Sequence, residues 1–179
     1  MGNIRVNYSL PKNMTSHPDL DKIIFLKTVD STNLELKRRR HEFQDTNVLL
    51  VSDAQSHGKG QKGRNWESAA NLGLWMSLFL GRKNSLSHRL QLLSIYTGTV
   101  VHKITSQLIQ SDIKLKWPND IMINSKKCGG ILTELQWQGD SIVSAIIGIG
   151  INMSHEKDDF SPSIQSHATS LKLEGIGRP

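Results

Sequence analysis

The sequence has neither the cysteine pairs that form disulfides in small secreted proteins nor a long apolar segment that would anchor a chain in a membrane. Its 179 residues include one cysteine, Cys128, which permits no internal disulfide and suits a reducing compartment. No apolar run approaches the roughly 20 residues of a membrane-spanning helix. The polar N-terminal segment also lacks the apolar stretch of a secretory signal. We therefore expect one soluble domain in the cytoplasm, with no membrane partner.

Several catalytic signatures are also missing. There is no G-x-S-x-G nucleophile elbow, and the seven histidines are scattered without H-E-x-x-H or another paired-ligand spacing. The sequence therefore predicts neither a serine hydrolase nor a zinc site held by the protein.

Negative charge is the scarcer sign, with 16 Asp and Glu against 22 Lys and Arg and a net charge of +6. This excess favours an anionic partner such as a nucleotide, a nucleic acid or an acidic protein, and a generally basic surface is the plain alternative. The run Arg38–Arg40 is expected in the last turn of a helix, where cations suit the helix dipole. A nucleic-acid-binding module should show a basic stripe with interleaved aromatic residues, whereas the cations here concentrate at loops.

Apolar runs separated by turn residues predict a sheet. Strands are expected at residues 23–27, 47–53, 72–80, 113–117, 120–124, 130–138 and 141–153. The last two flank Gly139-Asp140 and are expected to pair antiparallel.

Two helices are expected to pack on this sheet. The first starts at Thr32, whose side chain would cap it, with Glu35 completing a capping box. The second runs from Leu86 to about Leu108 and carries an apolar face. The residues of that face are Leu86, Leu90, Leu93, Val100, Ile104 and Leu108. The predicted fold class is α/β (α+β), a mixed β-sheet with packed helices rather than a doubly wound parallel sheet.

The stretch "SHGKGQKGRNWES" (residues 56–68) combines glycines, cations and a tryptophan in one loop. It satisfies G-x-G-x-x-G, but a strand follows it instead of a helix, so a dinucleotide site is not supported. It is also a near miss to the P-loop, because Arg64 and Asn65 replace the Lys and Ser/Thr. Its glycine amides and cations still suit an anion, and we expect the loop to order mainly around its ligand. An ordinary surface loop is the alternative.

Three further segments carry similar chemistry. "KWPND" breaks a strand with Pro118 and presents Asn119 and Asp120 at a turn, although such turns are often only structural. "SKKCGG" places Lys127 beside two glycines. "GIGIN" (residues 148–152) ends a strand with small residues that leave room for a ligand, or marks a strand at the sheet edge.

In this combination the sequence resembles the catalytic domain of biotin protein ligases (biotin–[acetyl-CoA-carboxylase] ligases), whose fold is class II synthetase-like. The matching segments are "DSTN", "QSHGKGQKGRNW", "NLGLWMSL", "KWPNDI", "KKCGGILTE", "IIGIGINM" and "ATSL", which extend from Asp30 to Leu171. "KWPND" and "GRNW" in this order are specific to that family. The lipoate and octanoyl transferases share the fold without this set of motifs.

The resemblance implies a binding site for biotin and its adenylate. The matching binding positions are Ser31, Thr32, Asn33, Gln55, Gly58, Lys59, Gly60, Gln61, Asn119, Gly130, Gly148, Gly150 and Asn152. Among them, Ser31, Thr32 and Gln55 match residues that recognise the ureido ring. Trp66 matches the residue that stacks at the adenine.

The resemblance also implies a catalytic set of Lys127, Arg64, Lys116 and Asp120. Lys127 matches the lysine that contacts the biotin carboxylate and the adenylate phosphate. Lys116 and Asp120 match positions around the phosphates of ATP and Mg²⁺. Gln61 stands where some relatives carry arginine, so retention of the adenylate is expected to rest more on neighbouring cations.

The implied activity is ATP-dependent conversion of biotin to biotinyl-5′-AMP, followed by transfer to a lysine of a biotin carboxyl carrier domain. The alternatives are a lipoate-type acyl ligase and a truncated biotin- and nucleotide-binding domain with incomplete activity. A homodimer is left open.

The expected organisation is an N-terminal arm over residues 1–22 and the catalytic domain over residues 23–179. The C-terminal β-barrel domain of the family is expected to be absent, so that the chain is a fragment or an incomplete gene product. The short segment before "DSTN" is expected to be too small for a winged-helix domain, which argues against DNA binding.

Overall fold

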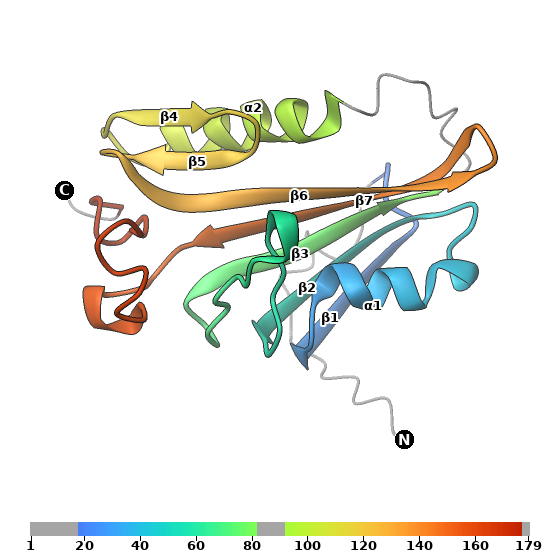
Figure 1. Ribbon diagram of the computed structural model, residues 1–179, viewed down its shortest axis with the longest axis horizontal. Helices are drawn as coiled ribbons and strands as arrows, with labels where there is room; N and C mark the ends of the chain where they lie inside the picture. Colours follow the sequence, from blue (N-terminus) through green and yellow to red (C-terminus); the bar gives the residue numbers. More distant parts are fainter. Residues whose placement is uncertain (1–17, 82–91, 177–179) are drawn as a thin grey trace.

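The computed structural model describes residues 18–81 and 92–176. Within these residues, seven strands form one sheet in the order β1-β2-β3-β7-β6-β5-β4 (Figure 1). The strands are β1 (Lys22–Val29), β2 (Asn47–Gln55), β3 (Gly73–Leu80), β4 (Ile113–Lys116), β5 (Asp120–Ile123), β6 (Lys126–Gln138) and β7 (Ser141–Asn152). β1 and β2 are parallel, and the other neighbours are antiparallel. The predicted mixed sheet is confirmed, and each predicted strand is present.

β7 lies in the middle of the sheet, between β3 and β6. Its residues 144–148 are all buried, as expected of a continuous apolar run that is covered on both faces. The alternative that residues 148–152 mark an edge strand is therefore wrong. The glycines at this end of β7 lie between two hydrogen-bonded neighbours.

The helices α1 (Thr32–Arg38) and α2 (Leu93–Ser106) cover opposite faces of the sheet (Figure 1). Asn33 of α1 lies against Gly148, which pairs with Leu132. Gly98 of α2 instead lies near Ile131, the chain neighbour of Leu132. Because successive residues of a strand point to opposite faces, the two helices occupy different sides. One core cluster, formed by Leu36, Phe43, Val48, Leu50, Phe79 and Ile146, fills the α1 side.

The start of α1 differs from the prediction. Ser31 is the N-cap residue, and its side chain makes no capping hydrogen bond. Thr32 is the first helical residue, and its hydroxyl contacts Gln55 and Ser77. The capping box of Thr32 and Glu35 is therefore wrong, because tertiary partners engage the hydroxyl that would have capped the helix.

The buried face of α2 also differs from the prediction. Val100 and Ile104 are 41% and 54% exposed, and Leu108, which lies beyond the end of α2, is 48% exposed. Leu93 is half-buried. The buried positions are Gly98, Val101 and Thr105. Gly98 decides this orientation, because a Cβ there would lie 2.8 Å from Leu115 Cδ1. The predicted positions Leu86 and Leu90 lie outside the described residues.

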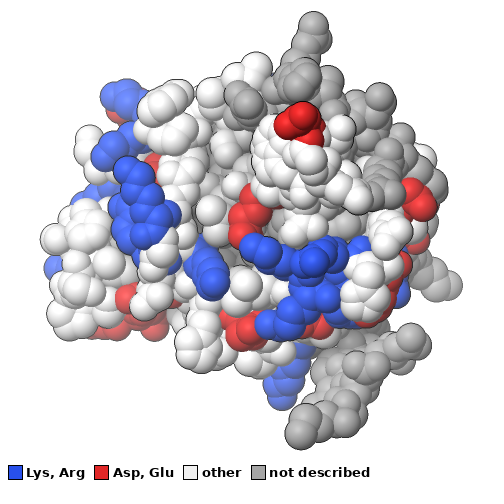
Figure 2. All heavy atoms as spheres, turned by 45° about the vertical axis from the view of Figure 1, so that its right-hand side comes forward, with Lys and Arg blue, Asp and Glu red and all other residues white. Residues whose placement is uncertain are grey.

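The basic end of α1 is neutralised locally. Arg38 contacts Asp30 and Glu35, and Arg39 contacts Glu42. The Arg38 guanidinium holds the pKa of Asp30 below its usual value. On the face shown in Figure 2, Lys and Arg side chains gather in separate groups bordered by Asp and Glu. Of the three arginines, only Arg38 lies in the last turn of α1, so the predicted placement is confirmed for that residue alone. Arg39 is the C-cap residue and Arg40 begins a short 3₁₀ helix (Arg40–Glu42).

The tail is irregular, as predicted, but it is tied to the sheet. Thr169 N donates to Lys127 O, and Asn152 Nδ2 donates to Thr169 O. Phe160 and Leu171 are buried. In the described part of the chain, no helix is both long enough and apolar enough to cross a membrane.

Candidate active site

A cavity of about 600 Å³ opens at one end of the sheet. The start of α1, the loop 56–68, the β4–β5 turn, the glycine-bearing parts of β6 and β7, and the tail all contribute to its lining. The predicted site residues in this lining are Ser31, Thr32, Asn33, Gln55, Lys59, Gly60, Gln61, Arg64, Trp66, Lys116, Asn119, Asp120, Lys127, Gly130, Gly148, Gly150 and Asn152. Tertiary folding therefore brings six separate segments of the chain to one cavity.

Gly58 is the predicted site residue that does not line the cavity. It is buried behind the loop, where an added Cβ would lie 2.4 Å from Trp66 O and 2.8 Å from Ser68 Oγ. Its carbonyl oxygen accepts a hydrogen bond from Trp66 N at 2.9 Å. Because it has no side chain, Gly58 allows the two arms of the loop to lie this close together.

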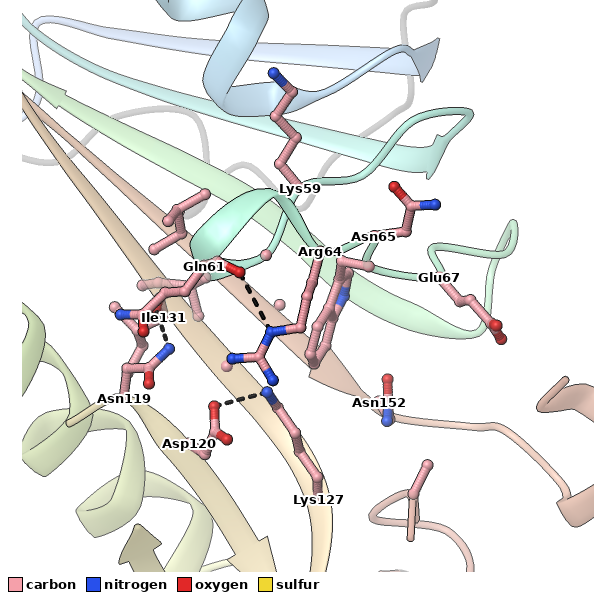
Figure 3. Close-up of a pocket in the computed structure, with 18 of the residues that line it drawn as sticks. Lys59, Gln61, Arg64, Asn65, Glu67, Asn119, Asp120, Lys127, Ile131 and Asn152 are labelled. Carbon is pink, nitrogen blue, oxygen red and sulfur yellow. Dashed lines mark hydrogen bonds and ion pairs between the residues drawn. The ribbon is translucent and has the colours of Figure 1, made fainter. Parts of the chain in front are cut away.

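The loop 56–68 folds back on itself. Isolated bridges join Gln55 to Ser68 and Lys59 to Asn65. At its tip, Lys62 and Gly63 have φ values of 57° and 73°, a left-handed conformation that reverses the chain. The reversal returns the chain toward the cavity, so that Arg64 points into it while the ammonium of Lys59 points away (Figure 3).

A group of charges occupies one end of the cavity. Lys127 Nζ lies 2.6 Å from Asp120 Oδ1, and the two side chains are 29% and 21% exposed. The guanidinium of Arg64 points toward this pair, and its Nε donates to Gln61 O at 3.3 Å (Figure 3). This end combines cations that suit an anionic ligand with one carboxylate that suits a cation.

A β-bulge brings Lys127 to this face of the sheet. The β5–β6 register shifts between Ile121, which pairs with Gly129, and Met122, which pairs with Lys127. Without the extra residue, strand alternation would put Lys127 and Gly130 on opposite faces. With it, the ideal Cβ position of Gly130 lies 3.6 Å from Lys127 Nζ. The extra residue, Cys128, is buried in a core cluster, and burial raises the pKa of its thiol to about 12.

Gly130 and Gly150 are cross-strand partners, and because neither has a side chain the surface of the sheet is flat at this pair. The indole of Trp66 packs on this flat surface: a Cβ on Gly150 would be 2.6 Å from Trp66 Nε1, and one on Gly130 would be 3.2 Å from Cζ3. Lys127 Nζ lies 5.2 Å from the ring centroid. The space that was predicted for a ligand beside Gly150 is therefore partly occupied by the indole of Trp66, which covers the charged end of the cavity.

Polar groups form the other end of the cavity. Gln55 Oε1 accepts from Thr32 N at 2.8 Å and contacts Thr32 Oγ1 at 3.1 Å. Gln55 Nε2 donates to Ser68 Oγ at 2.7 Å, which fixes the orientation of the amide. Ser31 is 2% exposed and lies at the same end.

Ser77 supports this polar end from behind and is a residue that sequence reasoning missed. It is 0% exposed, and its Oγ lies 2.6 Å from Thr32 Oγ1 and 2.5 Å from Asn33 Oδ1. The signal that could have found it is a serine in the otherwise apolar run "LWMSLFL", at a position where strand alternation points to the core.

Two predicted amides hold the frame of the site. Asn119 is 8% exposed and its Nδ2 donates to Ile131 O at 2.8 Å, which ties the β4–β5 turn to β6. Asn152 is 6% exposed and its Nδ2 donates to Thr169 O at 2.9 Å, which ties β7 to the tail. In this structure both side chains are engaged by backbone oxygens.

The tail and several apolar residues complete the walls. The lining residues that were not predicted include Met76, Met122, Ile131, Leu132, Ile149, Phe160, Ile164, His167 and Ala168. The apolar members suit an aliphatic ligand segment between a charged end and a polar end. The tail residues follow no periodic pattern, so only tertiary contacts reveal their place.

Comparisons with known proteins agree with this architecture. The model of the biotin/lipoate A/B protein ligase family matches residues 25–152. The bifunctional ligase/repressor BirA of Bacillus spizizenii is 41% identical over 154 residues, which cover 83% of this chain and 46% of that protein. Its counterpart in Escherichia coli is 30% identical over 177 residues, covering 94% of this chain and 54% of that protein. The chain thus spans about half the length of the curated relatives it matches.

Solved structures show the same fold. The biotin protein ligase of Aquifex aeolicus in complex with biotin and ATP superposes with a TM-score of 0.68 at 33% identity, covering 84% of this chain and 60% of that one. The biotin protein ligase of Leishmania major in complex with biotinyl-5-AMP gives 0.67 at 27% identity, covering 85% of this chain and 64% of that one. From its sequence and its fold, this chain belongs to the biotin/lipoate A/B protein ligase family.

Proposed function

We propose that the chain uses ATP to convert biotin to biotinyl-5′-AMP and transfers the biotinyl group to a lysine of a biotin carboxyl carrier domain. The observation that carries this proposal is one cavity with a cationic end at Lys127 and Arg64 and a hydrogen-bonding end at Thr32 and Gln55. Related proteins have been solved with biotin and ATP and with biotinyl-5-AMP. A ligand with a carboxylate at one end and a polar ring at the other fits this arrangement.

The first step requires two anions to approach each other. The biotin carboxylate attacks the α-phosphate of ATP, and pyrophosphate leaves. Lys127 and Arg64 lower the repulsion, since cations placed where negative charge gathers stabilise the transition state. Asp120 holds Lys127 Nζ at 2.6 Å and thereby keeps the ammonium directed into the cavity. Lys116, at the exposed rim, is assigned to the phosphates.

The second step requires protection from water. The amine of the carrier lysine attacks the carbonyl carbon of the mixed anhydride, and AMP leaves. The indole of Trp66, packed on Gly130 and Gly150, closes the sheet side of the charged end. A loop that shields the anhydride favours aminolysis over hydrolysis. We infer that the loop 56–68 becomes most ordered around the adenylate.

Magnesium fits the site as a companion of ATP. Among the described residues, no group of three or more His, Cys, Asp or Glu side chains could hold a metal ion. Mg²⁺ is commonly bound through one or two carboxylates together with substrate phosphates, and Asp120 offers one carboxylate. When bound, the ion would neutralise phosphate charge.

A lipoate-type acyl ligase is the second candidate, because the matching family includes lipoate ligases. The polar contacts of Gln55 with Thr32 and Ser68 favour a ligand whose far end forms hydrogen bonds. Lipoate ends in a disulfide ring without such donors. Calorimetric titration with biotin and with lipoate distinguishes the two, and tighter binding of lipoate would reject biotin as the substrate.

The test of function has three stages. Titration with biotin and ATP measures binding, ATP–pyrophosphate exchange measures adenylate formation, and labelling of a carrier domain measures transfer. We expect all three with the 179-residue chain. Binding and exchange without transfer would instead identify a domain with incomplete activity. A chain that binds neither biotin nor ATP would refute the proposal. A cytoplasmic location, a homodimer and the absence of DNA binding stay predictions.

A further inference from the structure

The hydroxyl of Ser77 makes two short contacts but carries only one proton. Its Oγ lies 2.6 Å from Thr32 Oγ1 and 2.5 Å from Asn33 Oδ1. Each of these oxygen–oxygen distances requires a proton between the two atoms, since lone pairs facing at that distance repel. A serine hydroxyl supplies only one proton, so the other contact must be filled by its partner.

The orientation of Asn33 decides which contact Ser77 fills. Asn33 Nδ2 donates to Glu134 Oε2 at 2.9 Å and faces Leu132 O at 3.4 Å. Both partners are acceptors, so the nitrogen and oxygen of this amide cannot be exchanged without loss of these bonds. Asn33 Oδ1 therefore faces Ser77 and brings no proton.

The directions of the remaining hydrogen bonds follow. Ser77 donates its proton to Asn33 Oδ1, and the proton between Ser77 and Thr32 must then come from Thr32. Gln55 Oε1 lies 3.1 Å from the Thr32 hydroxyl and could also accept this proton, but that contact is longer than the one to Ser77, and Gln55 Oε1 already accepts from Thr32 N at 2.8 Å. Because its proton is directed into the protein, the Thr32 hydroxyl offers the cavity only lone pairs.

We propose that Ser77 is a positioning residue that makes Thr32 a hydrogen-bond acceptor, so that the polar end of the cavity selects a ring bearing an N–H donor. Ser77 does not itself line the cavity, and it acts through Thr32. The proposal rests on the proposed function, and it names the ligand group that the polar end recognises, a ureido N–H. A ligand without such a donor would leave the buried Thr32 oxygen without a partner, which costs binding free energy.

The test compares two buried serines. Ser77→Ala removes the acceptor for the Thr32 proton. Ser144→Ala removes the same atom from a residue of β7 that is 5% exposed and does not line the cavity. We expect Ser77→Ala to raise the Kd and KM for biotin by roughly 10- to 100-fold, while the KM for ATP and kcat change little. Ser144→Ala should bind biotin as the wild type does. Thermal unfolding without ligand establishes that each variant is folded.

Two further measurements separate positioning from general damage. Biotin methylated at one or the other ureido nitrogen should bind the wild type much more weakly in one of the two forms, and Ser77→Ala should discriminate less. In a Thr32→Val background, which removes the acceptor, Ser77→Ala should add little to the loss of biotin affinity. Ser77→Thr, which keeps a hydroxyl, should restore affinity toward that of the wild type.

Each possible outcome either supports or overturns the role proposed for Ser77. Equal biotin affinity of the two alanine variants, or full additivity with Thr32→Val, overturns the role of Ser77. If Ser77→Ala does not fold, Thr32→Val with the methylated ligands still decides, because an unchanged preference between methylated and free biotin would overturn the acceptor role. Failure of the wild type to bind biotin would instead refute the proposed function and is recognised before any variant is made.

Discussion

The substitution Gly148→Ala, which adds one methyl group, should displace the Asn33 side chain and so disturb the site. Gly148 pairs with Ser77 of β3 and Leu132 of β6. In Gly148→Ala, the new Cβ would lie 2.3 Å from Asn33 Oδ1, 3.0 Å from its Cγ and 3.2 Å from its Nδ2. The strand cannot shift away from the contact, because both of its edges are hydrogen-bonded. The amide of Asn33 must therefore move.

The size of the effect follows from what the amide loses. Overpacking a buried position costs typically 1–3 kcal/mol. The displaced amide also gives up its bonds to Ser77 and Glu134, each worth about 1 kcal/mol net. Together these give a loss of about 3–5 kcal/mol in the free energy of unfolding, which corresponds to a fall in Tm of roughly 6–20 °C for a chain of this size. Biotin affinity should fall as well, since Asn33 adjoins Thr32.

Thermal unfolding and biotin titration test this reasoning. Gly60→Ala is the matched control for unfolding, because the nearest atom to its Cβ would be Arg64 O at 3.4 Å, and φ at this residue is −107°. We expect its Tm to stay near that of the wild type. If Gly148→Ala melted within about 1 °C of the wild type and bound biotin equally well, the contact with Asn33 would not be decisive.

Four further predictions concern separate parts of the molecule. Lys127→Ala should lower ATP–pyrophosphate exchange by about 100-fold or more while the chain stays folded, and unchanged exchange would reject its role in adenylate formation. Burial lowers the pKa of His155 below 6.5, so folding stability should fall as the pH drops below about 6.5 toward the folded-state pKa. The Tm of His155→Gln should then change less between about pH 7.5 and 5.5 than that of the wild type, and an equal change would contradict the assignment. Because burial raises the pKa of the Cys128 thiol to about 12, thiol reagents should react with it only as the chain unfolds, and rapid labelling of folded protein would disagree. Gly150→Ala should push the indole of Trp66 off the sheet, so an unchanged fluorescence spectrum would contradict the packing seen here.

Local pattern accounts for much of what could be predicted. The seven strands follow from apolar runs bounded by turn residues, because a strand that is buried on one or both faces needs such a run. Most of the cavity lining could also be named, because the resemblance to biotin protein ligases rests on short motifs, several of them at the ends of these strands. Both depend on residues close together in the chain.

Tertiary contacts decided the rest. Thr32 does not cap α1, because its hydroxyl meets Gln55 and Ser77, which lie 23 and 45 positions away in the chain. The buried face of α2 is set by the close approach at Gly98 rather than by the most apolar stripe.

Spatial packing also settled what the glycines and serines of the strands do. The space beside Gly148 is taken by Asn33, and that beside Gly150 by Trp66. The role proposed for Ser77 depends on Thr32 and Asn33, two neighbours on α1 that place oxygens 2.6 and 2.5 Å from its hydroxyl. Strand and helix patterns arise from the nearest residues in the chain, whereas hydrogen-bond direction and close packing depend on which distant groups share the same space.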